Sequence, residues 1–351
     1  MTKHHQKIHP NFKINSVPFS SLGILKQNED SPVFDKCLLK FFTEWLNDNP
    51  KINLQTSGST GNPKKITALK YSMILSAKNT GKYFNLKEGD RALLCLPLDF
   101  IAGKMMVVRA MVLGLNLFIS KPSGNPINEF SKEYDFAAMT PYQLDRVVSH
   151  VKKIKCLIIG GSPVGDSLKR VVENKTSGVF ETFGMTETLS HIAIKNLSNG
   201  EEVFSAIPGV TFSVKNEYLK ITAPFVSKTP IITKDKVDLI SSTKFKWIGR
   251  ASAIINSGGI KFSPESIERS LNKYYSQPFV ICGLPDKNLG EKIVLIFENN
   301  PPRDFQQYFN KLKRHEKPKA VFSLSNFKRI NGKIDRKDIK IKILEKIKNG
   351  K

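Results

Sequence analysis

Cysteine and histidine are scarce in this chain of 351 residues, and neither is spaced as a metal site requires. The four cysteines lie far apart and form no CxxC pair. Cys95, Cys156 and Cys282 sit inside apolar runs, which indicates buried small side chains in a reducing compartment. The six histidines form no HExxH pattern, and their one HxxxH spacing, His5 and His9, falls in the irregular N-terminal segment. The sequence therefore argues against a disulfide scaffold and against a histidine-based metal site.

Long hydrophobic runs are also missing. No stretch of 18 apolar residues occurs, and the polar N-terminus lacks the apolar core of a signal peptide. We therefore expect a cytoplasmic protein without integral membrane association. Hydrophobic residues make up 40% and charged residues 25% of the chain, which is ordinary for globular proteins and argues against disorder. The length predicts about two domains.

Acidic residues are few: 31 Asp and Glu stand against 55 Lys and Arg, which leaves a net charge of +24. Such a charge is typical of nucleic-acid-binding proteins. Residues 311–351 contribute +11 of it, and their basic residues alternate with apolar ones, as in a folded element with a solvated face. The excess is mostly Lys and accompanies many Asn and Ile, which fits a biased genomic composition. We therefore expect no nucleic-acid partner and keep that class as a remote alternative.

Short apolar runs alternate with helical patterns in the first half of the chain, after about 50 irregular residues. The runs read as strands are Ala92–Leu96, Leu117–Ile119, Phe136–Met139, Leu157–Ile159 and Val179–Phe183. The helical patterns are Tyr71–Phe84, Lys104–Leu113 and Pro141–His150. This alternation predicts an α/β fold with layered helices and strands.

After Gly209 the sequence pattern changes to short segments typical of β-hairpins: Thr211–Val214, Tyr218–Thr222, Ile231–Thr233 and Phe245–Ile248. A polar break at 249–252 follows. Beyond it we expect helices at Pro264–Leu271 and Arg303–Arg314 and strands at Phe279–Gly283, Lys292–Phe297 and Ala320–Leu324. The prediction is a large N-terminal layered α/β domain over 1–250 and a small α+β C-terminal lid domain over 251–351.

One loop has the composition of a phosphate-binding loop. It combines small hydroxyl residues, two glycines and a lysine, in Thr56, Ser57, Gly58, Ser59, Thr60, Gly61 and Lys64. Backbone N–H groups, hydroxyls and one cation are what phosphate oxygens require. The loop is not a Walker A motif, because Pro63 stands where that motif has glycine. A solvated Ser/Gly turn is the alternative for this segment taken alone.

Six segments together are similar to a known superfamily. They are Thr56–Lys64, Gly160–Pro163, Phe183–Thr188, Gly249-Arg250, Ser257–Gly259 and Asn331–Arg336. Their order and spacing resemble the adenylate-forming enzymes, which include acyl- and aryl-CoA synthetases, peptide-synthetase adenylation domains and luciferases. The resemblance runs from about Leu54 to Arg336. It implies ATP and CoA as co-substrates, a small carboxylic acid as acyl substrate, and Mg²⁺.

The resemblance implies a role for individual residues. The loop with Ser57, Ser59, Thr60 and Lys64 would hold the β- and γ-phosphates of ATP. Thr186 would contact the α-phosphate, Glu187 would bind Mg²⁺, and Lys333 would be the catalytic lysine. The implied adenine and ribose site consists of Gly160, Gly161, Ser162, Phe183, Gly184, Asp235 and Arg250. Ser252 matches the hinge between the domains, and Ser257, Gly258 and Gly259 match the passage for CoA.

Three departures from the family pattern stand out. Lys234 replaces the glycine before the ribose aspartate, and Ser252-Ala253 replaces an aspartate pair at the hinge. The chain also lacks roughly the first hundred residues that ordinary members place before the phosphate loop. It therefore resembles a short form of the family.

Two further segments point to a substrate. Leu96–Ala110 and Thr188–His191 resemble the compact o-succinylbenzoate–CoA ligases of menaquinone biosynthesis. This resemblance implies an acyl pocket made of Phe100, Gly103, Lys104, Ser190 and His191. A substrate with a second carboxylate needs a cation or donors for it, and Lys104 is the predicted cation. A surface lysine and a core histidine are equally weighted alternatives for Lys104 and His191, and another acyl- or aryl-CoA ligase is the alternative function.

Overall fold

The computed structural model describes residues 8–22, 36–55, 65–126, 133–173, 178–250, 254–330 and 333–349. The predicted phosphate loop, with Thr56, Ser57, Gly58, Ser59, Thr60, Gly61 and Lys64, lies outside these ranges, as does the predicted hinge Ser252. Lys333 is described by its backbone alone.

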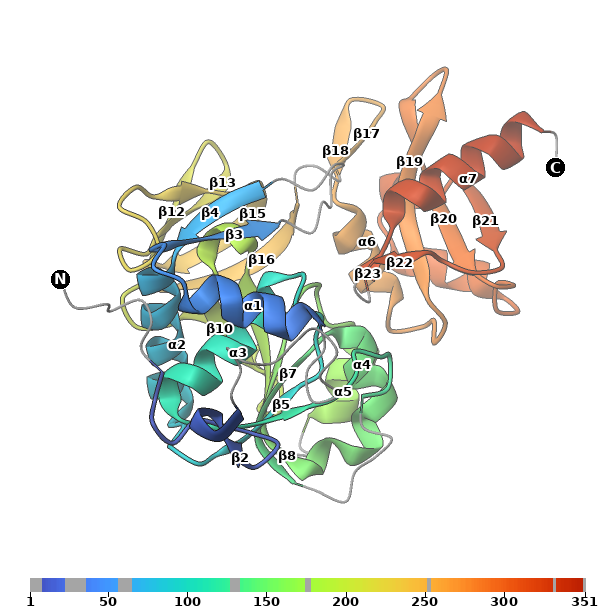
Figure 1. The fold of residues 1–351 in the computed structure, drawn as a ribbon. Coiled ribbons are helices and arrows are strands. Elements are labelled where there is room, and N and C mark those ends of the chain that lie inside the picture. The colour runs from blue at the N-terminus through green and yellow to red at the C-terminus, as the bar shows by residue number, and fades with distance from the viewer. Residues whose placement is uncertain are drawn as a thin grey trace.

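A mixed sheet of 11 strands runs through the first two thirds of the chain (Figure 1). Its order is β15-β16-β11-β10-β9-β8-β7-β5-β6-β1-β2. The middle of the sheet, from β1 to β9, is parallel, whereas β10, β11, β16 and β15 continue it antiparallel. The strands are β1 Lys13–Ile14, β2 Val17–Pro18, β5 Arg91–Leu94, β6 Asn116–Ile119, β7 Tyr134–Met139, β8 Ile154–Ile159, β9 Val179–Gly184, β10 His191–Asn196, β11 Phe204–Ala206, β15 Asp235–Ser241 and β16 Lys244–Arg250.

Helices cover both faces of the parallel strands, so alternate strand residues enter two different cores. Along β8, Cys156 and Ile158 pack with α1, α2 and α3, whereas Leu157 and Ile159 pack with α4 and α5. Burial on both faces is why these strands read as unbroken apolar runs. The helices are α1 Lys36–Leu46, α2 Lys70–Phe84, α3 Ile101–Leu113, α4 Pro141–Val147 and α5 Asp166–Val172.

Two smaller pairings complete this part of the chain. Three of the four predicted hairpin pieces form a three-stranded sheet of β12 Thr211–Lys215, β13 Tyr218–Thr222 and β14 Ile231–Ile232, whereas the fourth, Phe245–Ile248, lies in β16 of the large sheet. A second pairing, β3 Lys51–Gln55 with β4 Lys65–Leu69, was not expected from the sequence. Because Gln55 pairs with Lys65, the two strands bracket the predicted phosphate loop.

The C-terminal part forms its own five-stranded sheet with a core on each face. Along β19, Ile281 packs in the core beneath α6, and Cys282 packs in the core beneath α7. The elements are β17 Ile255–Ser257, β18 Ile260–Phe262, α6 Pro264–Leu271, β19 Phe279–Asp286, β20 Gly290–Glu298, β21 Ala320–Leu324, β22 Arg329–Ile330, β23 Lys333–Ile334 and α7 Arg336–Lys348. Figure 1 shows this unit beside the large sheet, next to β16 and α4.

Three sequence predictions need correction. The helix expected over Arg303–Arg314 is a short 3-10 helix, Phe305–Lys311, because apolar residues three apart stack on one side of a 3-10 turn. The helix expected over Pro141–His150 is α-helical only to Val147. The first 50 residues contain α1, whose buried side chains are Leu38, Phe41, Phe42 and Trp45.

None of the four cysteines, all of which the structure describes, forms a disulfide. Cys95, Cys156 and Cys282 are buried, as predicted, and Cys37 at the start of α1 is exposed. Burial raises the pKa of Cys95 and Cys156 to about 12 and that of Cys282 to about 11.

In the described part of the chain no helix is long and apolar enough to cross a bilayer.

Candidate active site

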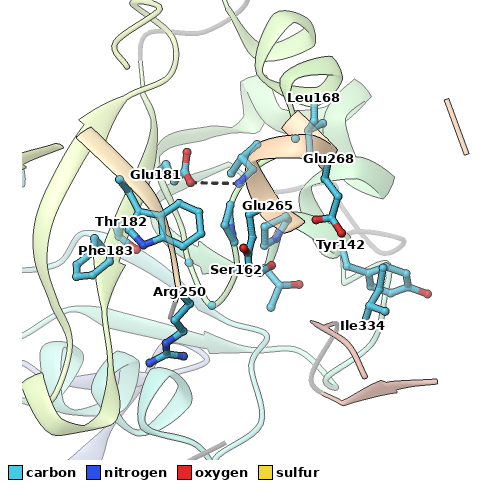
Figure 2. Close-up of a pocket in the computed structure, with 18 of the residues that line it drawn as sticks. Tyr142, Ser162, Leu168, Glu181, Thr182, Phe183, Arg250, Glu265, Glu268 and Ile334 are labelled. Carbon is cyan, nitrogen blue, oxygen red and sulfur yellow. Dashed lines mark hydrogen bonds between the residues drawn. The ribbon is translucent and has the colours of Figure 1, made fainter. Parts of the chain in front are cut away.

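A cleft of about 2380 Å³ opens where β5, β7, β8 and β9 end. The carboxyl ends of parallel strands form the usual ligand-binding edge of an open α/β sheet. The loops after these strands line the cleft, together with α6 and residues 328–330 and 334–338 of the C-terminal unit. Figure 2 shows residues of both units around this space, among them Phe183, Ser162 and Glu265.

Two glycines turn the chain sharply after β8. The N–H of Gly160 donates to the carbonyl of Met139 at 3.0 Å, and a Cβ on Gly160 would lie 2.8 Å from Oγ1 of Thr182. Gly161 has a φ of +93°, which side chains rarely adopt. The loop therefore runs close along β9, and Gly160, Gly161 and Ser162 all line the cleft.

A tight turn follows β9. A Cβ on Gly184 would lie 2.4 Å from the carbonyl oxygen of Ser190, so the two ends of the turn can approach only with glycine there. The hydroxyl of Thr188 accepts from the N–H of Met185 at 2.9 Å and fixes the turn. Thr186 is buried, and Glu187 is exposed at the cleft.

Asp235 and Arg250 form a cross-strand pair at the ends of β15 and β16. Asp235 is buried, and its Oδ1 lies 3.6 Å from Nε of Arg250. The indole N–H of Trp247 donates to the same oxygen at 3.1 Å. Burial raises the pKa of Asp235, and the charge of Arg250 opposes that rise. The structure thus brings these two predicted residues together, with Trp247 as a third member.

A buried ion pair that the sequence analysis missed lies in the same cleft. Nζ of Lys195 is 2.9 Å from Oε2 of Glu181, and it also lies 4.5 Å from the centre of the Phe204 ring. The other carboxylate oxygen accepts from the N–H of Val164 at 3.1 Å. A glutamate inside the apolar run of β9 was the available signal, but its partner depends on the register between β9 and β10.

Only some of the residues predicted for the acyl pocket line the cleft. Phe100, the residue before α3, lines the cleft, as do Ser190 and His191. Gly103 is buried behind it, where a Cβ would lie 2.3 Å from the carbonyl oxygen of Pro97. Lys104 does not line the cleft. Its ammonium lies 4.0 Å from Glu44 and 5.3 Å from the centre of the Phe41 ring, both on α1.

A different cation, Arg109 of α3, lies beside Ser190 and His191. Its Nη2 donates to Oγ of Ser190 at 2.5 Å, and its Nε donates to Oγ1 of Thr80 at 3.3 Å. His191 contacts the same two hydroxyls, each at 3.3 Å. Burial, and then the charge of Arg109, lower the pKa of His191 well below its ordinary value, so this histidine is neutral at pH 7.

The C-terminal unit brings a second set of predicted residues. Ser257, Gly258 and Gly259 form the β17–β18 turn, in which both glycines have positive φ, as tight hairpin turns require. They do not line the cleft. Lys333 begins β23, two residues before α7 is capped by Asp335. Arg336 lines the cleft.

Arg336 is tied to α6 by an ion pair. Its guanidinium donates to both carboxylate oxygens of Glu268, at 2.7 and 2.6 Å. Glu268 also accepts from the N–H of Ile281 at 2.7 Å. The pair joins α6, β19 and the start of α7, and it fixes the chain that follows Lys333.

The two units touch next to the cleft. Nη2 of Arg269 donates to the carbonyl of Trp247 at 3.4 Å. A Cβ on Gly249 would lie 2.3 Å from Oγ of Ser263, so glycine permits the approach of α6 to β16. The guanidinium of Arg329 lies 5.4 Å from the centre of the Tyr142 ring on α4.

The mixed sheet, the cleft at the ends of its parallel strands and the small α+β unit beside it define the fold of the adenylate-forming enzymes. A family model described as "AMP-binding enzyme" matches residues 25–224, which is more than half of the chain. The chain belongs to this family.

Individual relatives agree with this assignment. An acyl-CoA synthetase (AMP-forming)/AMP-acid ligase II-like protein from Dyadobacter fermentans is 31% identical, with a TM-score of 0.60; the match covers 92% of this chain and 97% of that one. The o-succinylbenzoate coenzyme A synthetase from Bacillus subtilis, solved with ATP and magnesium ion, shares the fold at 21% identity and a TM-score of 0.70, over 82% of this chain and 69% of that one.

The curated relatives are longer proteins. The 2-succinylbenzoate–CoA ligase of Lactococcus lactis is 21% identical over 336 residues, which cover 87% of this chain and 74% of that protein. Matches to other curated proteins of the same name cover as little as 30% of their length.

Proposed function

We propose that this protein is an ATP-dependent acid–CoA ligase that forms an acyl-adenylate and then transfers the acyl group to CoA. One observation carries the proposal: Thr186, Glu187 and the Asp235–Arg250 pair lie on the same cleft as the glycine turn after β8. A cleft with a buried, hydrogen-bonded aspartate at one end and an exposed carboxylate near a glycine turn suits a magnesium-bound nucleotide.

The nucleotide would lie along the ends of β8, β9 and β15. In this proposal Asp235 accepts from the ribose hydroxyls, and Arg250 orients Asp235. Adenine lies against the backbone of 160–162, with Phe183 and Gly184 on its other side. Thr186 contacts the α-phosphate, and the loop 56–64 holds the β- and γ-phosphates.

Glu187 is the proposed ligand of Mg²⁺. The residues that the structure describes contain no group of three or more His, Cys, Asp or Glu side chains close enough to hold a metal ion. This fits Mg²⁺, which is commonly held by one or two carboxylates and by phosphate oxygens of the substrate. When bound, the ion would neutralise phosphate charge.

Adenylation needs positive charge more than it needs an acid or a base. A weak carboxylate nucleophile attacks the α-phosphorus, and negative charge grows on the phosphate oxygens and on the departing pyrophosphate. Lys333 supplies the positive charge in this proposal. The Glu268–Arg336 pair positions the segment that carries Lys333.

The second half-reaction requires a different arrangement of the same parts. We divide the chain into a nucleotide- and acyl-binding domain, 1–250, and a mobile lid, 251–351, that turns about Ser252. The turn withdraws Lys333 and brings Ser257, Gly258 and Gly259 to the cleft as the passage for CoA. The CoA thiolate then attacks the acyl carbonyl, and AMP leaves.

The proposed acyl substrate is o-succinylbenzoate, which places the enzyme in menaquinone biosynthesis in the cytoplasm. The curated proteins similar to this chain that carry the name 2-succinylbenzoate–CoA ligase support this choice. Another acyl- or aryl-CoA ligase is the alternative.

A panel of carboxylic acids tests the proposal. Each acid is incubated with the protein, ATP, Mg²⁺ and CoA, and acid-dependent AMP release is measured. We expect the highest kcat/KM with o-succinylbenzoate. Activity on a monocarboxylate without activity on o-succinylbenzoate would overturn the proposed substrate. A lack of AMP release with every acid would overturn the proposed ligase activity.

A further inference from the structure

The ring of Tyr142 lies where the two units meet. Tyr142 is the second residue of α4, and a capping box between Thr140 and Gln143 fixes the start of that helix. The guanidinium of Arg146, one turn further along α4, lies 3.6 Å from the centre of the ring. A Cβ on Gly124 would lie 2.7 Å from Cε1 of Tyr142, so glycine there leaves room for the ring. The N-terminal unit therefore holds this ring in a fixed position.

The C-terminal unit presents Arg329 to the same ring. Its Cζ lies 5.4 Å from the ring centre. The guanidinium donates to both carboxylate oxygens of Glu298, at 2.7 and 2.5 Å, and to the carbonyl of Phe327 at 3.1 Å. The hydrogen bond from Arg329 lowers the pKa of Glu298, and the charge of Arg146 in the other unit contributes to the same shift. Glu298 therefore balances the two cations that share the Tyr142 ring.

Arg329 is also tied to the strand that contains Lys333. β22 pairs with β23 in antiparallel register, with Arg329 opposite Ile334 and Ile330 opposite Lys333. Tyr142 and Ile334 both line the cleft (Figure 2). Because the two strands are paired, a displacement of Arg329 from the ring would move the backbone of Lys333 as well.

The contact between Tyr142 and Arg329 lies far in the sequence from the boundary near residue 250. The contacts that Trp247 and Gly249 make with α6 and its N-cap lie next to that boundary. A contact beside a pivot can persist when one unit turns against the other, whereas a contact far from the pivot is made in only one arrangement. The Tyr142–Arg329 contact is therefore the one of the three that a rotation must break.

We propose that Tyr142 and Arg329 are positioning residues for adenylation, because their contact seats β22 and β23, and with them Lys333, on the cleft. This inference rests on the proposed function and names the contact that must open before thioester formation. A cation is attracted to the face of a tyrosine ring without a fixed hydrogen-bond geometry. Such a contact can form and break in each catalytic cycle.

Tyr142→Leu tests the inference, since leucine removes the aromatic face and leaves the Glu298–Arg329 pair intact. The assay uses the acid with the highest kcat/KM in the panel above. We expect kcat of acid-dependent ATP–pyrophosphate exchange to fall roughly 3- to 30-fold, the range of a lost cation–π contact. Thioester formation from preformed acyl-adenylate and CoA should change less than twofold or become faster. Equal losses in both half-reactions would mean that Tyr142 binds substrate or supports the fold, and would overturn the inference.

Two further variants control for the chemistry of the change. Tyr142→Phe keeps the aromatic face and should retain adenylation within about twofold of wild type. A loss as large as that of Tyr142→Leu would show that the hydroxyl acts instead of the ring. Tyr274→Leu is the matched control, because Tyr274 stacks on Tyr308 at 4.7 Å within the C-terminal unit and does not line the cleft. It should leave both half-reactions unchanged.

A double-mutant cycle tests whether the two residues act through one contact. Arg329→Met removes the cation and keeps the ring, so it should also slow adenylation. Adding Tyr142→Leu to Arg329→Met should then have little further effect on the adenylation rate. Fold losses that multiply would show that the two residues act independently and would contradict the proposed contact.

Hydrogen exchange supplies a readout that needs no substrate. In ligand-free Tyr142→Leu the amides of β22 and β23 should exchange faster than in wild type, while those of β19 and β20 keep their wild-type rates. Unchanged exchange in all four strands would overturn the contact itself. A wild-type protein that activates no acid would instead overturn the proposed function, whereas the exchange result would still report the contact.

Discussion

Asp235 and Arg250 lie opposite each other in the register of β15 and β16, and the carboxylate of Asp235 also accepts a hydrogen bond from Trp247. The aspartate is 4% exposed, whereas the side chain of Arg250 is 40% exposed at the mouth of the cleft. A carboxylate has about four lone-pair sites, so Asp235 retains the capacity to accept hydrogen bonds besides those with Trp247 and Thr233. This is the property that a ligand with neighbouring hydroxyls requires.

Asp235→Asn should therefore weaken ATP binding while leaving the fold intact. Asparagine can still accept from Trp247, but it loses the charge-assisted hydrogen bonds proposed for the ribose. We expect the KM for ATP to rise roughly 10- to 100-fold in the pyrophosphate-exchange assay. Asp238→Asn, on the exposed side of the same strand, is the control. An unchanged KM in Asp235→Asn would contradict the assigned role.

Lys333→Ala should separate the two half-reactions. Acid-dependent pyrophosphate release should fall by at least about 100-fold, because the positive charge proposed to stabilise the departing pyrophosphate is lost. Thioester formation from a preformed acyl-adenylate and CoA should persist. Lys348→Ala, at the exposed end of α7, should leave both rates unchanged. Equal survival of both half-reactions in Lys333→Ala would show that the role of Lys333 is wrong.

Glu268→Gln should destabilise the C-terminal unit. The change leaves the Arg336 guanidinium without its ion partner; since 36% of that side chain is exposed, water offsets part of the cost. We expect the free energy of unfolding to fall by about 2 kcal/mol, measured by urea denaturation. Glu202→Gln breaks the exposed pair with Lys246 and should cost less than about 0.5 kcal/mol. Similar losses of unfolding free energy in the two variants would show that the Glu268–Arg336 pair stabilises the protein no more than an exposed ion pair does.

His191 should make stability depend on pH. Because the pKa of His191 is lowered in the folded protein, the unfolded chain binds an extra proton as the pH falls below about 6.5. The contribution to stability is complete above that pH and is lost on acidification, by at most about 1.4 kcal/mol per pH unit. We expect His191→Gln to flatten the fall in the free energy of unfolding between pH 7 and 5. His150→Gln, at an exposed site, should not, and parallel curves for His191→Gln and wild type would disprove the prediction.

The parallel strands β5 to β9 were predictable because helices cover both of their faces and each reads as a short apolar run, whereas β1, β2, β10, β11 and β15 were not predicted. β8 and β9 are longer than predicted but lie where the runs indicated. α1 was missed although Leu38, Phe41, Phe42 and Trp45 have helical spacing, because the surrounding residues are weakly patterned. The 3-10 helix at Phe305–Lys311 was mistaken for an α-helix, since spacing by three residues fits both.

The parts of the cleft that a short sequence motif forms were predictable. The contacts between residues on distant strands or helices were not. The glycine turn after β8 and the turn at Thr186 follow from local sequence. Lys104 was predicted as the cation for a second carboxylate, but the rotation of α3 directs it toward α1 and directs Arg109 toward Ser190. The Glu181–Lys195 pair depends on the register of β9 and β10, which the sequence does not reveal.

The distribution of the four thiols makes this chain selectively addressable by chemical labelling. At pH 7 the buried Cys95, Cys156 and Cys282 are shielded from solvent and almost fully protonated, whereas Cys37 is exposed on α1. A maleimide fluorophore should therefore attach at one position of the native protein without any cysteine being removed. Together with a second dye introduced on α7, that single natural handle would allow the distance between the two units to be followed by energy transfer while ATP, acid and CoA are added in turn.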